Sequence, residues 1–326
     1  MNISALIPTY NRRTQVLRAI QSVLSQTVPV GEIIVVDDGS TDGTVEAIRE
    51  RYGLSVSVFR QENAGVSAAR NRAIREARGE WVAFLDSDDE WLPSKIERQV
   101  DALKALGSEF GLCFTDCIYD EGKSTNNSVF QQAKFAGSGP FGRLDDPAEY
   151  LLGPANLLSI QSTLVLRSLV EDIKGFDEGI RIMEDLDAFF RLTFKTKFCF
   201  VSDPLMRIDR NPGRTNALCE LFATRDDRKY DDLRRIHTRW LEMPEVIGSK
   251  YENPIRKSLR LLYYESVESN IRGFKAGAAL REIARLRALK ESYGSIVLNL
   301  ASRKIRKLRR DIRASLWIAA PKVARH

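Results

Sequence analysis

Residues 32–44 read EIIVVDDGSTDGT, and this stretch decides the fold class. Its apolar run, Ile33–Val36, has no polar interruption, which is typical of a strand buried on both faces of a parallel sheet. Asp37 and Asp38 end the run, and Asp42 suits the start of a helix that Gly53 closes. A buried strand that leads directly into a helix predicts an α/β fold.

The same alternation of strand and helix extends along the chain. Apolar runs predict strands, and apolar residues three and four positions apart predict helices. We expect a mostly parallel sheet with flanking helices and right-handed crossovers, a loop at 121–146 and a mainly α-helical region after residue 217. Strands are expected at 3–8, 32–38, 54–60, 80–86, 110–120 and 197–208, and helices at 12–26, 41–53, 65–79, 93–107 and 184–196.

The composition is that of a globular protein, with 43% hydrophobic and 29% charged residues. No basic region precedes an apolar run at the N-terminus, so we expect no signal peptide. No apolar stretch reaches the roughly 18 residues of a spanning helix. The four cysteines form no CxxC pair and are expected to be buried, reduced thiols of a cytoplasmic protein. Two histidines argue against a His-rich metal site and a Ser-His-Asp triad.

Polar residues follow each of the first four predicted strands, at the sheet edge where ligands bind in this architecture. Each group alone is explained equally well by helix caps or surface charge, but four groups on one edge favour a binding site. The chain has neither GxGxxG after its first strand nor GxxxxGK[ST], which argues against an ordinary dinucleotide site and a P-loop. The groups are Pro8–Asn11, Asp37–Ser40, Asn63 with Arg70, and Asp86–Asp89.

An acidic cluster stands out in EWVAFLDSDDEWLP, residues 80–93. Asp86, Asp88 and Asp89 lie within four positions, where like charges repel and raise each other's pKa. Leu85 and Trp91 flank the cluster, which weakens the alternative of a solvated turn. Hard oxygen ligands suit Mg²⁺ or Mn²⁺, which bind one or two carboxylates and complete their shell with water and phosphate.

Four segments, ALIPTYNR, IIVVDDGSTDGT, NAGVSAARNRAI and WVAFLDSDDEWLP, occur in this order and resemble the nucleotide-binding half of the bacterial family 2 glycosyltransferases, which have the GT-A fold. The resemblance covers residues 2–120 and extends more loosely to about residue 215 through GFDEGIRIMEDLDAFFRL and PLMRIDRNPGRTN. It implies a catalytic domain at 1–215, divided into a nucleotide-sugar half at 1–120 and an acceptor-side half at 121–215. A helical, basic region at 216–326 follows.

The resemblance also implies roles for single residues on the donor side. Pro8, Thr9 and Tyr10 would line the nucleoside pocket, with Tyr10 stacking on the base. Asp38 would accept a hydrogen bond from the base, typically from uracil N–H. Arg70 would lie near the nucleotide.

The acidic cluster corresponds to the D-x-D element of the family. Asp88 would bind the metal directly, and Asp86 would reach the ribose or the metal's water shell. Asp89 either joins them or caps the helix that begins near Pro93. A divalent cation on the diphosphate stabilises the charge that develops when the sugar leaves.

The segment MEDLDAFF supplies the candidate general base, which must lie away from the metal. The resemblance implies Asp185 as the base, with Glu184 second, in a direct displacement that inverts the anomeric carbon. The alternative is a helix N-terminus with favourable acidic residues. Asp187 is expected to face solvent.

One position departs from the family. Many relatives carry a histidine after the last strand, where this chain has Asn211, a poorer metal ligand. Arg207, Arg210 and Arg214 either compensate by pairing with the diphosphate or are surface charge.

Basic residues concentrate at the end of the chain, with 15 Lys and Arg against 3 Asp and Glu from Ile271 on. Residues 301–318 form a basic amphipathic pattern that predicts either contact with an anionic membrane surface or packing on the protein.

From the resemblance as a whole, we expect a metal-dependent enzyme that moves a sugar from a UDP-linked donor to a glycan or lipid-linked saccharide. The alternative is a non-catalytic nucleotide or nucleic-acid binding protein that acts through the basic helix predicted at 301–318.

Overall fold

The computed structural model describes residues 1–120, 128–135, 137, 139–153, 157–210, 228–272 and 275–289. These residues pack as two units. The first holds the sheet and contains the described residues up to Arg210, apart from 148–153. The second contains residues 148–153 and the described residues from 228 onward.

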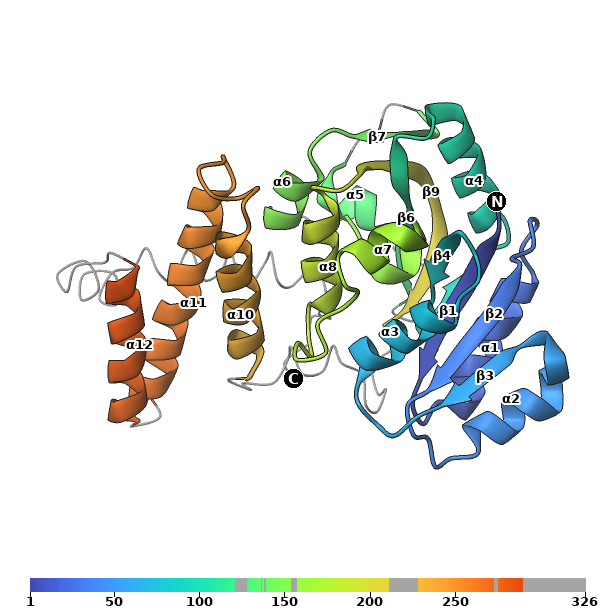
Figure 1. Cartoon of the computed structure of the whole chain (residues 1–326), viewed down its shortest axis with the longest axis horizontal. Coiled ribbons are helices and arrows are strands. Elements are labelled where there is room, and N and C mark those ends of the chain that lie inside the picture. The colour runs from blue at the N-terminus through green and yellow to red at the C-terminus, as the bar shows by residue number, and fades with distance from the viewer. Residues whose placement is uncertain are drawn as a thin grey trace, which may run out of the picture. The chain divides into compact units, whose positions relative to one another are not determined.

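The described strands form one nine-stranded sheet in the order β3-β2-β1-β4-β8-β6-β9-β5, with β7 paired to β9 (Figure 1). The predicted parallel half is confirmed, because β1 (Ile3–Thr9), β2 (Glu32–Asp37), β3 (Ser57–Arg60) and β4 (Trp81–Phe84) are parallel neighbours. The rest is mixed. There β8 (Thr163–Leu166) runs antiparallel between β4 and β6 (Phe110–Asp120), β9 (Lys197–Asp209) runs parallel to β6, and β5 (Glu90–Trp91) and β7 (Phe141–Leu144) run antiparallel to β9.

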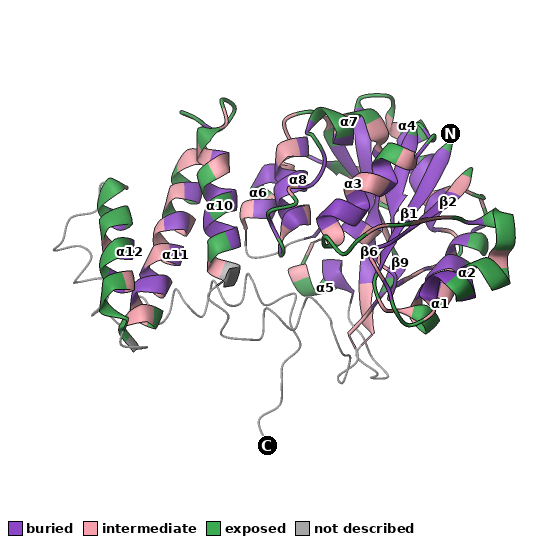
Figure 2. Ribbon diagram, turned by 60° about the horizontal axis from the view of Figure 1, so that its bottom comes forward, coloured by how far each residue is buried: buried purple, intermediate pink, exposed green. Residues whose placement is uncertain are grey.

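The helices follow the predicted periodicity and cover a buried sheet (Figure 2). Every residue of β1 is buried, as expected of a strand covered on both faces. Helix α1 buries Val16, Ala19, Ile20 and Val23, which repeat at three and four positions. The helices of this unit are α1 (Arg13–Leu24), α2 (Thr44–Tyr52), α3 (Val66–Glu76), α4 (Lys95–Leu106), α5 (Val129–Ala133), α7 (Arg167–Asp172) and α8 (Glu184–Leu192).

The loop predicted for 121–146 is wrong over two stretches. Ser128 begins α5 with a capping box, in which its side chain accepts from the Gln131 N–H and the Gln131 side chain accepts from the Ser128 N–H. Residues 141–144 form β7 on the edge of β9. Polar composition alone misses both elements, because a capping box and an edge strand use the same polar residues as a loop.

Lys95 lies in the core at the start of α4 and is fully buried. Its Nζ donates to Gln99 Oε1 at 2.9 Å and lies 4.4 Å from the centroid of the Trp91 ring. Burial lowers the pKa of Lys95 from 10.5 to about 7. Cys113, Cys117 and Cys199 are buried free thiols, as predicted, and Cys219 lies outside the described residues.

The second unit is helical in its described part, as predicted, with α6 (Pro147–Leu152), α10 (Arg228–Glu242), α11 (Glu252–Arg272) and α12 (Ala276–Ala288). Ile236 and Trp240 of α10 are buried. The His237 ring packs against the Trp240 ring with the two centroids 5.1 Å apart and the planes tilted, and burial lowers the pKa of His237 to about 4. None of the described helices combines the length and apolar character needed to span a membrane. Residues 301–318 lie outside the described residues.

Candidate active site

The parallel register brings the predicted polar strand ends to one edge of the sheet. Thr9 at the end of β1 pairs with Asp37 of β2, and Asp37 pairs with Arg60 of β3. Beyond β4, the Leu85 N–H donates to the Leu6 carbonyl at 3.0 Å, so the D-x-D segment leaves the sheet beside β1. Backbone pairing therefore brings the ends of β1, β2 and β3 and the start of the D-x-D segment to one edge of the sheet.

Asp38 fixes the turn that follows β3. Its Oδ1 accepts from Gln61 Nε2 at 2.8 Å and from the Ala64 N–H at 3.0 Å, and its Oδ2 accepts from the Gly65 N–H at 2.8 Å. Gly65 has φ +90°, a conformation that favours glycine. A nucleobase that hydrogen-bonds to Asp38 would therefore meet a carboxylate that backbone amides already hold in place.

The turn after β1 carries the predicted nucleoside residues. Pro8 and Thr9 are buried, and Thr9 Oγ1 has no hydrogen-bond partner in the described part of the chain. Tyr10 as a whole residue is 44% exposed, as a side chain that stacks on a bound ring needs to be. Asn11 ties this turn to the next one, since its N–H donates to Ser40 Oγ and its Oδ1 accepts from the Thr41 N–H, both at 2.8 Å.

Arg70 bridges Asp86 of the D-x-D element and Glu184 at the start of α8. It is 2% exposed on α3, its Nη2 donates to Asp86 Oδ1 at 2.7 Å, and its Nη1 donates to Glu184 Oε1 at 2.5 Å. Burial alone would lower the pKa of Arg70, but Asp86 and Glu184 raise it above its ordinary value. Arg70 Nε is buried and has no hydrogen-bond partner among the residues described.

The three carboxylates of the acidic cluster differ in their surroundings. The side chains of Asp86 and Asp88 are 26% and 17% exposed, whereas Asp89 is buried. Asp89 Oδ1 accepts from the Asp209 N–H at 3.0 Å, which ties the cluster to the end of β9. Burial, followed by the charges of Asp88 and Asp86, raises the pKa of Asp89 well above its usual value. The capping alternative for Asp89 is wrong, because the N-cap of α4 is Ser94 and no side chain makes a capping hydrogen bond there.

Two residues at this site escaped the sequence analysis. Arg12 Nη1 donates to Asp88 Oδ2 at 2.5 Å, and Gln161 Nε2 donates to Asp86 Oδ2 at 2.6 Å and to Asp89 Oδ2 at 3.0 Å. Gln161 lies in a short 3₁₀ helix, Ile160–Ser162, just before β8. No local pattern marks either residue, because the contacts join positions more than 70 residues apart.

The exposed part of the acidic cluster fits a hard divalent cation. Asp86 and Asp88 present two partly exposed carboxylates, each already bonded to a neighbouring side chain, and two is the number that Mg²⁺ or Mn²⁺ takes when phosphate and water complete the shell. Among the described residues, no three His, Cys, Asp or Glu side chains are grouped so that they could hold a metal by themselves. A cation here would thus need ligands from a bound substrate, and it would compete with Arg12 for Asp88.

The candidate general base, Asp185, lies at the start of α8, next to Glu184, which pairs with Arg70. Met183, in the left-handed region at φ +63°, precedes the helix and turns the chain into it. Glu184 is buried against Arg70, whereas Asp185 is partly exposed and accepts from the Leu186 N–H at 2.8 Å. Burial raises the pKa of both carboxylates, to about 7 for Glu184, and Arg70 opposes the shift in each case.

The prediction that Asp187 faces solvent is wrong. Asp187 is fully buried, and its Oδ2 accepts from Arg191 Nε at 2.9 Å and from Arg191 Nη2 at 2.8 Å. Arg191 also donates to the Ile173 and Gly175 carbonyls. The pair therefore fastens α8 to the segment after α7.

The residues after β9 are only partly described. Arg207 is exposed within β9, and the Arg210 guanidinium lies 5.1 Å from the Tyr119 ring centroid. Asn211 and Arg214 lie outside the described residues. Their roles stay predictions.

Comparison with known proteins finds similar sequences and similar folds. Residues 4–150 match the sequence model of "Glycosyl transferase family 2". The chain is 44% identical over 114 residues to the putative teichuronic acid biosynthesis glycosyltransferase TuaG of Bacillus subtilis, which covers 33% of this chain and 44% of TuaG. It spans only 31 to 63% of the length of three curated relatives, TuaG among them.

Two solved structures show the same fold at low identity. TarS 1–349 of S. aureus, in complex with UDP-GlcNAc, aligns with TM-score 0.62 and 20% identity over 98% of this chain and 89% of that one. The mannosyltransferase PcManGT of Pyrobaculum calidifontis, in complex with GDP-Man and Mn²⁺, aligns with TM-score 0.56 and 16% identity over 98% and 86%. Residues 4–150 of this chain thus belong to glycosyl transferase family 2, and the chain has the GT-A fold.

Proposed function

We propose that the protein is an inverting glycosyltransferase that moves a sugar from a UDP-linked donor to a hydroxyl of a glycan or lipid-linked saccharide. The observation that carries the proposal is the bridge through Arg70. One buried guanidinium bonds to Asp86 of the D-x-D element and to Glu184 beside the candidate base. Donor-side and acceptor-side carboxylates thereby share one network, which a site for nucleotide binding alone does not need.

The donor would bind along the edge formed by the first four strands. The exposed residue Tyr10 offers a ring for stacking, and Asp38 offers acceptor oxygens held by the amides of residues 64 and 65. Support for a uracil nucleotide comes from TarS, a structural neighbour solved with UDP-GlcNAc. We therefore assign Pro8, Thr9, Tyr10, Asp38, Arg70 and Asp86 to the nucleotide.

Asp88, assisted by Asp86, would hold Mn²⁺ or Mg²⁺ together with the diphosphate. Such a cation neutralises charge on the leaving diphosphate. The chain's own part is to present two carboxylates of different accessibility, with Asp89 and Gln161 fixing the loop that carries them. PcManGT, a neighbour of the same fold, was solved with Mn²⁺.

Asp185 would accept the proton of the attacking hydroxyl. Its partial exposure leaves it open to an acceptor, whereas Glu184 is occupied by Arg70. Burial raises the pKa of Asp185, which makes its carboxylate a stronger base than an exposed aspartate. Glu184 then acts as a positioning residue that holds Arg70 toward Asp86.

The relative TuaG supports an acceptor in cell-surface polysaccharide synthesis, since its name assigns it to teichuronic acid biosynthesis. We place the enzyme in the cytoplasm. Peripheral contact with the inner membrane face stays tied to residues 301–318, outside the described residues. The alternative, a non-catalytic nucleotide or nucleic-acid binding protein, depends on that same segment and does not account for the bridge through Arg70.

Calorimetric titration with UDP tests the donor site. With Mn²⁺ present, UDP should bind to the full chain, and Asp88→Ala should abolish the metal-dependent part. Asp185→Asn should keep that binding but lower the release of UDP from a hydrolysed nucleotide sugar by a factor of about 10² or more, since it removes the base. Glu171→Gln, which changes an exposed carboxylate on α7, is the matched control. UDP binding indifferent to Mn²⁺ would favour the non-catalytic alternative.

A further inference from the structure

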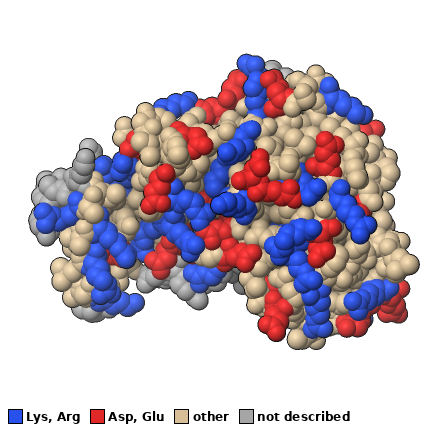
Figure 3. All heavy atoms as spheres, in the orientation of Figure 1, with Lys and Arg blue, Asp and Glu red and all other residues tan. Residues whose placement is uncertain are grey.

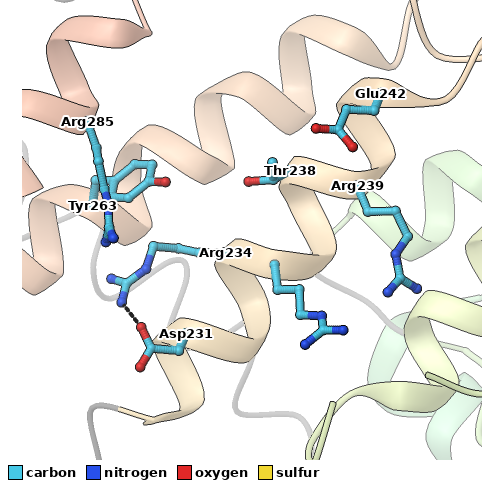
Figure 4. A pocket seen from close by; sticks show the side chains of 8 residues that line it. Asp231, Arg234, Thr238, Arg239, Glu242, Tyr263 and Arg285 are labelled. Atoms are coloured by element: carbon cyan, nitrogen blue, oxygen red, sulfur yellow. Dashed lines mark hydrogen bonds and ion pairs between the residues drawn. The ribbon is translucent and has the colours of Figure 1, made fainter. Parts of the chain in front are cut away.

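Lys95 is a fully buried amine in the first unit, and no carboxylate of the described residues pairs with it. Figure 3 shows, for one face of the molecule, Lys and Arg side chains that lie at the surface among Asp and Glu. In the second unit, Arg234 is 8% exposed and pairs with Asp231 (Figure 4). Because a buried cation without a carboxylate is unfavourable, Lys95 lowers the stability of the fold. Its contacts point to a role at the acidic cluster instead.

The first of these contacts fixes the amide of Gln99. Lys95 Nζ donates to Gln99 Oε1 at 2.9 Å. Gln99 is fully buried, and its Nε2 donates to the carbonyls of Cys113 and Ser162, both at 2.9 Å. Reversing the amide would turn its oxygen toward two carbonyl oxygens, so only one orientation satisfies all the partners. In that orientation Gln99 ties the 3₁₀ helix Ile160–Ser162 to β6.

The same 3₁₀ helix carries Gln161, which holds two members of the acidic cluster. Gln161 Nε2 donates to Asp86 Oδ2 at 2.6 Å and to Asp89 Oδ2 at 3.0 Å, so both of its N–H groups are used. These bonds fix the separation of two carboxyl groups that repel each other when ionised.

A second set of contacts joins Lys95 to this helix. The Gln161 carbonyl accepts from Trp91 Nε1 at 3.2 Å, and the centroid of the Trp91 ring lies 4.4 Å from Lys95 Nζ. Lys95 therefore supports the 3₁₀ helix both through the Gln99 amide and through the indole ring of Trp91.

We propose that Lys95 and Gln99 are positioning residues for the acidic cluster and act through Gln161. They hold the 3₁₀ helix so that Gln161 sets the separation and rotation of the Asp86 and Asp89 carboxyl groups. The purpose of this positioning rests on the proposed function, in which the cluster holds a divalent cation together with the diphosphate. Lys95 thus serves the site while it lowers the stability of the fold.

Hydrogen exchange of the full chain without ligand, followed by mass spectrometry, tests the coupling. Lys95→Met should raise the exchange rate of amides within 86–89 and 160–162 about five-fold or more, because these segments lose a support. A lysine with no positioning role would give the opposite result, since a more stable variant exchanges more slowly or at the same rate. Gln161→Leu should raise the rate within 86–89 by a similar factor. Lys104→Met, on the exposed side of the same helix, should change both rates less than about two-fold.

Calorimetric titration with Mn²⁺ in the presence of UDP tests what the positioning serves. Gln161→Leu should weaken Mn²⁺ binding about ten-fold and Lys95→Met about three-fold, since the first removes the contact to Asp86 and the second only loosens it. Gln21→Leu, which removes an exposed amide on α1, should change the affinity less than about two-fold. Weaker binding by Lys95→Met would not result from unfolding, because this variant should be the more stable protein.

Raised exchange together with weaker Mn²⁺ binding supports the proposal. Unchanged or slower exchange within 86–89 and 160–162 in Lys95→Met overturns it, and so does raised exchange with unchanged Mn²⁺ affinity. Failure of the wild type to bind Mn²⁺ with UDP would contradict the proposed function instead. The exchange rates alone would then decide whether Lys95 positions the acidic cluster.

Discussion

Lys95→Met should stabilise the protein, and the gain should depend on pH. The pKa of Lys95 is about 7 in the folded state against 10.5 for an ordinary lysine. Between these values the unfolded chain binds more protons than the native one, so stability rises with pH through this window and the lysine destabilises most at its lower end. The shift corresponds to about 4 kcal/mol at pH 7 and about 2 kcal/mol at pH 9.

Methionine keeps the length of the side chain but removes the hydrogen bond to Gln99 Oε1, at a cost of about 1 kcal/mol. The variant should therefore be more stable than the wild type by about 3 kcal/mol at pH 7 and by about 1 kcal/mol at pH 9. Urea unfolding followed by far-ultraviolet circular dichroism at both pH values measures the difference.

Lys104→Met is the control, since Lys104 is exposed on the same helix. It should change the free energy of unfolding little, and equally at both pH values. A Lys95→Met gain that is the same at pH 7 and pH 9 would refute the reasoning. It would show that Lys95 keeps its charge in the core through contacts other than Gln99 and the Trp91 ring.

Three further changes test the site and the second unit. Arg12→Gln should tighten Mn²⁺ binding in the presence of UDP about five-fold by calorimetry, because Asp88 loses a competing cation; unchanged affinity would show that the ion pair does not oppose the metal. Asp187→Ala should lower the free energy of unfolding by about 3 kcal/mol, since it leaves the nearly buried charge of Arg191 without its carboxylate. Asp187→Asn should lower the free energy of unfolding clearly less than Asp187→Ala does. Equal losses for the two variants would contradict this explanation. His237→Gln should stabilise the chain by about 2 kcal/mol more at pH 5 than at pH 7. The reason is that the pKa of His237 is lowered to about 4, so the wild type loses stability as the pH falls from 6.5 toward 4. Urea unfolding at both pH values measures the gain, and a gain independent of pH would contradict this prediction.

The parallel half of the sheet was predictable because a local sequence pattern marks each of its strands. Each is an apolar run followed by a helix with its own periodicity, as in β2 and α2. The insertion of β8 between β4 and β6 was not predictable in this way. Its pairing joins residues about 80 positions apart, and nothing within the strand specifies its neighbours.

The site residues divide in the same way, into those that a local sequence pattern reveals and those that only the folded chain brings together. Carboxylates such as Asp86 and Asp88 are visible as a cluster, but their partners Arg12 and Gln161 are set by the folded chain. Asp187 is different, since a signal was present. Arg191 lies four residues later on the same helix face, the spacing at which an acid and a base pair.

The position of β8 has a consequence for how the chain can be divided. The segment that carries the family motifs ends near residue 150, before β8 begins at Thr163. A protein cut between these points would expose the facing edges of β4 and β6, both lined by buried apolar residues. Unpaired edges of this kind recruit other chains. Residues 1–150 are therefore not a complete sheet by themselves, and transferring them into another protein requires β8 to move with them.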